Sequence, residues 1–115
     1  MNVQWARKWV EALRSGEYKQ TQGFLKDEKG YCCLGVLVKI AGDGCRIDDD
    51  GDWEANTILP MSVMDKVGMK SQTGRIYDEK SSADFISGST LAMLNDNGKD
   101  FNEIADVIEA NVDIL

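Results

Sequence analysis

Apolar residues recur at three- and four-residue spacing near both ends of the chain. After Asn2 the apolar positions are Trp5, Ala6, Trp9, Val10 and Leu13, while most charged residues fall on the other face. Asn2 suits a helix N-cap, and Ser15-Gly16 suits a helix end. Near the C-terminus, Asp100 and Glu103 have capping-box spacing ahead of a second apolar stripe. The pattern predicts two amphipathic helices.

Three further helices are predicted between these two. Residues 33–41 are apolar nearly all round and end at Gly42, which is typical of a helix in the centre of a domain. Pro60 and Gly68 give start and stop signals for a two-turn helix over 61–67. Ser89 can cap a helix through Thr90–Leu94.

The remaining segments favour short hairpins. Residues 24–26 and 31–32 flank the turn formers 27–30, and an acidic tip at 48–52 separates Ile47 from Trp53. Residues 75–77 and 84–86 are the other candidate strands. We therefore expect an α+β fold in a single globular domain over residues 1–115, with four to five helices packed on a short antiparallel sheet or hairpins.

Composition excludes several kinds of chemistry. The chain has no His, so His-based catalytic pairs, metal ligands and pH switches are excluded. Its formal net charge of -7 argues against coating duplex nucleic acid, and no sequence-specific DNA binding is expected. The charge is uneven, because the basic residues concentrate in residues 1–46 and the acidic residues in 47–115. The first part could meet an anion, whereas the second is either a solvated face or a surface for basic partners.

The chain also indicates its compartment. Its start lacks the apolar core of a secretory signal, and no apolar run is long enough for a membrane span. Three cysteines, two of them adjacent, fit reduced thiols better than a disulfide scaffold. We expect a cytoplasmic protein that makes no membrane contact.

Two motifs raise candidate chemistry. Asp48, Asp50 and Asp52 alternate as Ca²⁺ ligands do, but the spacing to Gly51 fails the EF-hand pattern, so a turn tip is favoured. We expect no metal and no cofactor.

Cys32-Cys33 at a helix start could supply a nucleophile, since a helix N-terminus lowers a thiol pKa. Only Asp96, Asp78 or a lysine could serve as its base, and packing in the core is the favoured role. Asn95-Asp96 fits either a helix cap or a polar group presented to a ligand. No catalytic residue is assigned.

Several segments together resemble a known family of small proteins associated with phage and prophage genomes. The most specific are Cys32-Cys33-Leu34-Gly35-Val36-Leu37 and Leu94-Asn95-Asp96. The others are Trp9 with residues 12–16, Tyr18-Lys19-Gln20, Tyr31, Leu59-Pro60, Leu91, Gly98, Phe101, 104–106 and 108–109. Many members carry a further Cys where this chain has Val38-Lys39, which weakens any metal or redox role here.

The resemblance implies a non-enzymatic accessory protein that acts by binding during infection, most plausibly in counter-defence. The first expectation is sequestration of a nucleotide-type immune signal, by aromatic stacking, hydrogen bonds to ribose or base, and cationic contacts to phosphate. The candidate ligand-binding residues are Arg7, Trp9, Arg14, Tyr18, Lys19, Gln20, Tyr31, Cys32, Asn95 and Asp96. The alternatives are an acidic inhibitor that blocks a host defence protein or nuclease and, behind it, a Cys-dependent enzyme. Homo-oligomerisation stays open.

Overall fold

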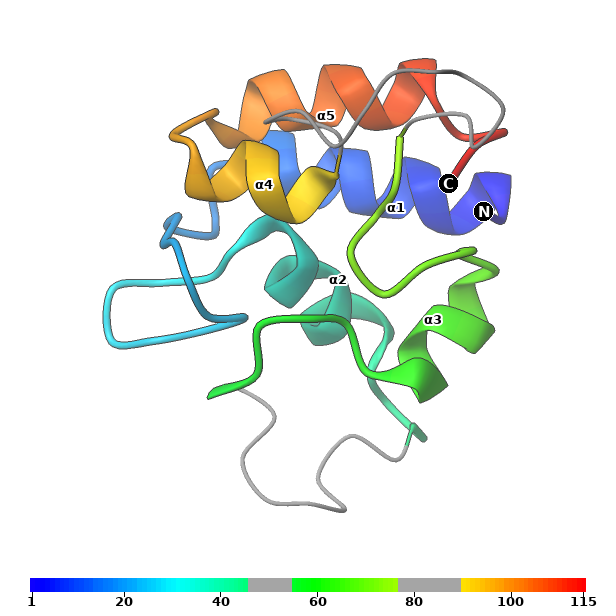
Figure 1. Ribbon diagram of the computed structural model, residues 1–115, viewed down its shortest axis with the longest axis horizontal. Coiled ribbons are helices and arrows are strands. Elements are labelled where there is room, and N and C mark those ends of the chain that lie inside the picture. Colours follow the sequence, from blue (N-terminus) through cyan, green and yellow to red (C-terminus); the bar gives the residue numbers. More distant parts are fainter. Residues whose placement is uncertain (46–54, 77–89) are drawn as a thin grey trace.

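The computed structural model describes residues 1–45, 55–76 and 90–115 (Figure 1). These parts contain the helices α1 (Val3–Arg14), α2 (Cys33–Ala41), α3 (Met61–Val67), α4 (Leu91–Asp96) and α5 (Phe101–Ala110). The acidic tip at 48–52 and the candidate strand at 84–86 lie outside the described residues. None of the described helices is long and apolar enough to cross a membrane.

The expected capping residues begin and end most of the helices. The Asn2 side chain accepts hydrogen bonds from the backbone N–H groups of Gln4 and Trp5, and Asp100 accepts one from Glu103. Gly68 closes α3 in the left-handed conformation. At α4 the N-cap is Thr90, one residue later than expected, since its hydroxyl accepts from the Met93 N–H. The five predicted helices are thus confirmed, although α4 runs over Leu91–Asp96 and so differs from the predicted 90–94 at both ends.

Helix α2 lies at the centre of the fold. All of its residues except Lys39 and Ile40 are buried, and it contacts α1, α3 and α4 (Figure 1). Helices α1 and α5 pack side by side and run in opposite directions. Trp9 of α1 is fully buried in the core, and its indole Nε1 donates to the Cys33 carbonyl at 2.9 Å. The prediction of a central helix is therefore confirmed.

The expectation of an α+β fold is wrong. The described residues form helices and no β-strand, and their only ladder-type pairs are isolated bridges: Gln20 with Tyr31, Lys26 with Tyr31, and Arg75 with Thr90. The protein is a small all-helical globule over these parts.

The hairpin expected around 27–30 forms its turn but not its strands. The Asp27 carboxylate accepts from the backbone N–H groups of Lys29 and Gly30, and from the Thr21 hydroxyl at 2.7 Å. These hydrogen bonds hold the pKa of Asp27 below its usual value. Pairing stops at Tyr31, however, because Cys32 is already the N-cap of α2 and the chain turns helical at once. A single residue cannot extend a strand.

One close approach fixes α2 against the loop before it. A Cβ added at Gly35 would lie 1.8 Å from the backbone oxygen of Leu25. Leu25 is itself held between two segments, because its N–H donates to Asn56 and its carbonyl accepts from the Cys32 N–H. The Gly in Cys-Cys-Leu-Gly-Val-Leu is therefore required by packing.

Candidate functional site

The sequence-predicted site residues fall into two separate groups in the structure. One group surrounds Asn95 at the junction of the 18–33 loop with α4. The other is the pair Arg7 and Arg14 on α1, two helical turns apart. Trp9 leaves α1 from a nearly opposite face. Arg7 and Arg14 are thus separated from the predicted stacking residues, whereas Lys19 lies in the same loop as Tyr18 and Tyr31.

Asn95 is fully buried and every polar atom of its amide is used. Its Oδ1 accepts from the Cys33 N–H at 3.1 Å and from Gln20 Nε2 at 2.9 Å, while its Nδ2 donates to the Thr21 carbonyl at 2.7 Å. Gln20 also donates to the Lys99 carbonyl. The amide thus ties α4 to the start of α2 and to the 20–21 loop, and its complete burial keeps it from contact with a ligand.

Asp96 follows a similar pattern at the surface. It accepts a 2.9 Å hydrogen bond from the Gly23 N–H through Oδ1. Its side chain therefore positions the loop ahead of Leu25. Elsewhere in the same loop, the backbone N–H of Tyr31 donates to the backbone carbonyl of Lys19.

The Tyr18 and Tyr31 rings meet edge to face with centroids 5.4 Å apart. Both rings are half-buried, and Lys26 lies over the Tyr31 ring at 5.6 Å. This arrangement packs the 18–31 loop on itself.

Cys32 and Cys33 are both buried, with different contacts. The Cys32 sulfur accepts from the Gly35 N–H as the cap of α2, and the Cys33 thiol donates to the Leu91 carbonyl. Burial raises the pKa of Cys32, and it raises that of Cys33 well above its usual value. The effect of the helix N-terminus is outweighed, so the geometry favours packing over nucleophilic chemistry.

Thiol labelling tests this assignment. With iodoacetamide near pH 7, we expect native protein to react first at Cys45, whose side chain is partly exposed, and far more slowly at Cys32 and Cys33. Peptide mapping by mass spectrometry after timed quenching gives the three rates. Labelling of Cys32 faster than of Cys45 would contradict the assignment, and the denatured chain provides the control in which all three react alike.

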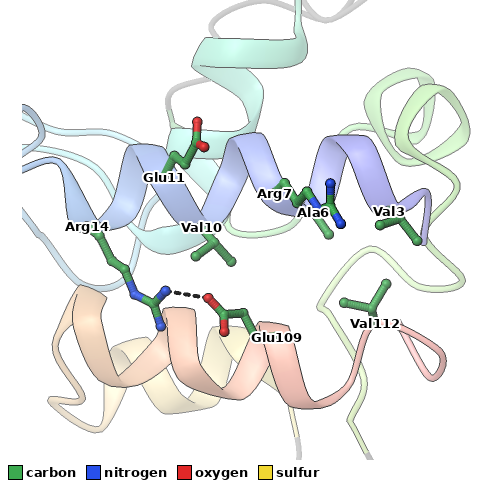
Figure 2. Close-up of a pocket in the computed structure, with 8 residues that line it drawn as sticks. All are labelled: Val3, Ala6, Arg7, Val10, Glu11, Arg14, Glu109 and Val112. Atoms are coloured by element: carbon green, nitrogen blue, oxygen red, sulfur yellow. Dashed lines mark hydrogen bonds and ion pairs between the residues drawn. The ribbon is translucent and has the colours of Figure 1, made fainter.

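A groove of about 540 Å³ with both apolar and charged lining residues lies between α1 and α5 (Figure 2). Ala6 and Val10 form its buried floor, and Val3 faces Val112 at one end. Val3 is 56% exposed. The groove therefore presents apolar surface to solvent beside charged groups.

The two arginines of the groove differ in their partners. Arg14 reaches across to α5, where it forms ion pairs with Asp106 and Glu109, and these hydrogen bonds raise its pKa. Arg7 is exposed and has no hydrogen-bond or ion-pair partner among residues 1–45, 55–76 and 90–115. Glu11 lies at the rim and points away from α5 in Figure 2. Arg7 is thus the groove cation that can pair with an anionic group of a ligand.

Sequence reasoning missed the apolar half of this groove. The apolar spacing placed Val10 in a helix stripe and singled out neither Val3 nor Val112, and nothing in the sequence says which helices lie side by side. One signal was available: Asp106 and Glu109, three residues apart, present two carboxylates on one side of a helix to an arginine elsewhere.

Within the described ranges, no group of three or more Cys, Asp or Glu side chains could hold a metal ion. The alternating Asp48, Asp50 and Asp52 lie outside these ranges.

Comparison with known proteins places the chain in a family. No curated protein and no solved structure matches it. Residues 1–112 match a family described as a domain of unknown function, DUF8296. The match spans all five helices and both sides of the groove. The chain therefore belongs to the DUF8296 family.

Proposed function

We propose that this protein acts without catalysis, by stoichiometric binding of a partner protein that docks on the groove between α1 and α5. The observation that carries the proposal is the guanidinium of Arg7, which has no partner among the described residues and lies beside an apolar groove whose end residue, Val3, is exposed. Exposed apolar surface rimmed by polar groups is typical of interaction sites. The resemblance to phage and prophage proteins gives the setting: counter-defence against a host protein.

Of the two binding functions expected from the sequence, the geometry favours the protein partner over the nucleotide. Trp9 is buried with its indole N–H already bonded, and Asn95 is fully buried with both Oδ1 and Nδ2 hydrogen-bonded to the chain itself. The groove contains no aromatic ring on which a base could stack. A nucleotide at Arg7 would thus have a phosphate contact without base recognition.

The docking face in this proposal is the groove and not the acidic surface of α5. Asp106 and Glu109 are paired with Arg14, and Glu103 lies 3.6 Å from the Lys99 ammonium. Their fields are partly cancelled by these cations, so they imitate a nucleic-acid backbone poorly.

Site-specific photo-crosslinking tests the proposal. A photoreactive amino acid is introduced at Val3, inside the groove, or at Met61, which is 58% exposed on α3 and outside it. Each variant is expressed in bacteria that carry active defence systems and are irradiated during infection. We expect a discrete protein adduct at position 3 and none at position 61.

The substitutions Val3→Glu and Met61→Glu provide the matched functional readout. Both side chains are more than half exposed, so neither change should unfold the chain. We expect Val3→Glu to abolish protection of phage in an infection assay and Met61→Glu to leave it intact. Equal protection by both variants would overturn the protein-partner function. So would the absence of an adduct at position 3 together with a nucleotide that stays bound to the purified protein in native mass spectrometry.

A further inference from the structure

The groove between α1 and α5 also indicates what shape of partner it accepts, an inference that rests on the proposed function. We infer that its occupant is an amphipathic helix of at least two turns, carrying a carboxylate that pairs with Arg7. The helix would lie on α1 and α5 as the third member of a helix layer.

The backbone of the groove walls excludes recognition by an added strand. Both walls are helices, α1 (Val3–Arg14) and α5 (Phe101–Ala110), whose N–H and C=O groups bond within each helix. An extended peptide would find no sheet edge to pair with and would leave its own backbone groups unpartnered. A helix satisfies its backbone internally, so it can enter an apolar groove through side chains alone.

The dimensions agree with a helical ridge. Val3 and Val10 are seven residues apart on one side of α1. The apolar part of the groove along α1 is therefore about 10 Å long, at a rise of 1.5 Å per residue. That length matches two turns of a helix with apolar residues at i, i+3 or i+4, and i+7. Beyond it the Arg14 ion pairs with α5 close the groove.

The charged residues of the groove favour an acidic residue beside the apolar stripe of the bound helix. Arg14 and its two carboxylates already neutralise one another in large part, whereas Arg7 has no partner in the described parts of the chain. A carboxylate beside the apolar stripe of the occupant would complete a charge-assisted hydrogen bond there. A lysine in the same place would face an uncompensated guanidinium.

A displayed library of random 16-residue peptides tests this inference with the full chain as bait. We expect selected sequences to share apolar residues at helical spacing, with Asp or Glu at one fixed position beside them. Selection against the charge-reversal variant Arg7→Glu should place Lys or Arg at that same position. Lys8→Glu, one residue away and outside the groove, should retain the acidic preference.

Synthesised peptides of each class then complete the test. We expect each to bind its own bait at least about tenfold more tightly than the other bait, and to gain helicity by circular dichroism on mixing. Failure to enrich any peptide, a two-residue apolar period, or a preference unchanged by Arg7→Glu would overturn the helix inference. If a protein adduct still forms at position 3, the proposed function survives that failure; if it does not, both fail.

Discussion

Replacement of Gly35 by alanine is expected to cost about 3 kcal/mol or more of unfolding free energy, the upper end for overpacking. A Cβ at this position would lie 1.8 Å from the Leu25 oxygen, which is backbone and cannot rotate away. The roughly 1 kcal/mol that alanine gains over glycine in a helix interior does not offset this clash. Urea denaturation followed by far-UV circular dichroism measures the loss.

Gly44→Ala is the matched control for Gly35→Ala. Nothing lies within 4 Å of a Cβ at Gly44, but its φ of 79° is left-handed. Alanine there should cost only the conformational penalty, about 1–2 kcal/mol. A Gly35→Ala variant as stable as Gly44→Ala would show that α2 can move away from Leu25, contrary to the packing described above.

Replacement of Asn95 by alanine is the second large effect. It leaves the Cys33 N–H and the Thr21 carbonyl unpartnered in the interior, each at about 1–3 kcal/mol. We expect a total loss of about 3 kcal/mol or more in the same denaturation experiment. Asn102→Ala is the control, because Asn102 is exposed on α5, and it should change stability by less than about 0.5 kcal/mol.

Asn95→Asp gives this second prediction a pH signature. The new side chain must keep its proton to donate to the Thr21 carbonyl, and burial also disfavours its charged form. The folded variant therefore binds this proton more tightly than the unfolded chain does. Its stability relative to wild type should be greatest below about pH 4, the usual Asp pKa, and should fall as the pH rises through the raised value. A pH-independent difference would mean that the amide donor contributes little.

The helices could be predicted because their signals are local. Asn2 and Asp100 cap with their own side chains, and each apolar stripe needs only the sequence of one helix. The sheet was predicted wrongly because a turn at 27–30 says nothing about how many residues remain to pair after it. Cys32 leaves none, since it caps α2.

The candidate site was harder to predict, because the same polar residue types can either bind a ligand or stabilise the fold. Asn95, Gln20 and Trp9 carry the polar groups expected of a binding site, but they bond to the chain itself. The groove depends on α1 and α5 lying side by side, a long-range pairing that no single-segment pattern contains. Arg7 was a candidate because of its charge, and the structure places it apart from Asn95 and Gln20, which were predicted to share its site.

The separation of the two faces of α1 has an evolutionary consequence. Trp9 anchors the helix to the core, while Val3 and Arg7 sit in solvent on the groove side, without bonds to the residues that hold the fold together. Substitutions at exposed positions of this kind usually change stability by no more than about 0.5 kcal/mol. Relatives that share the Cys-Cys-Leu-Gly-Val-Leu packing can therefore diverge at Val3 and Arg7 and change the chemistry of the groove at almost no cost in stability.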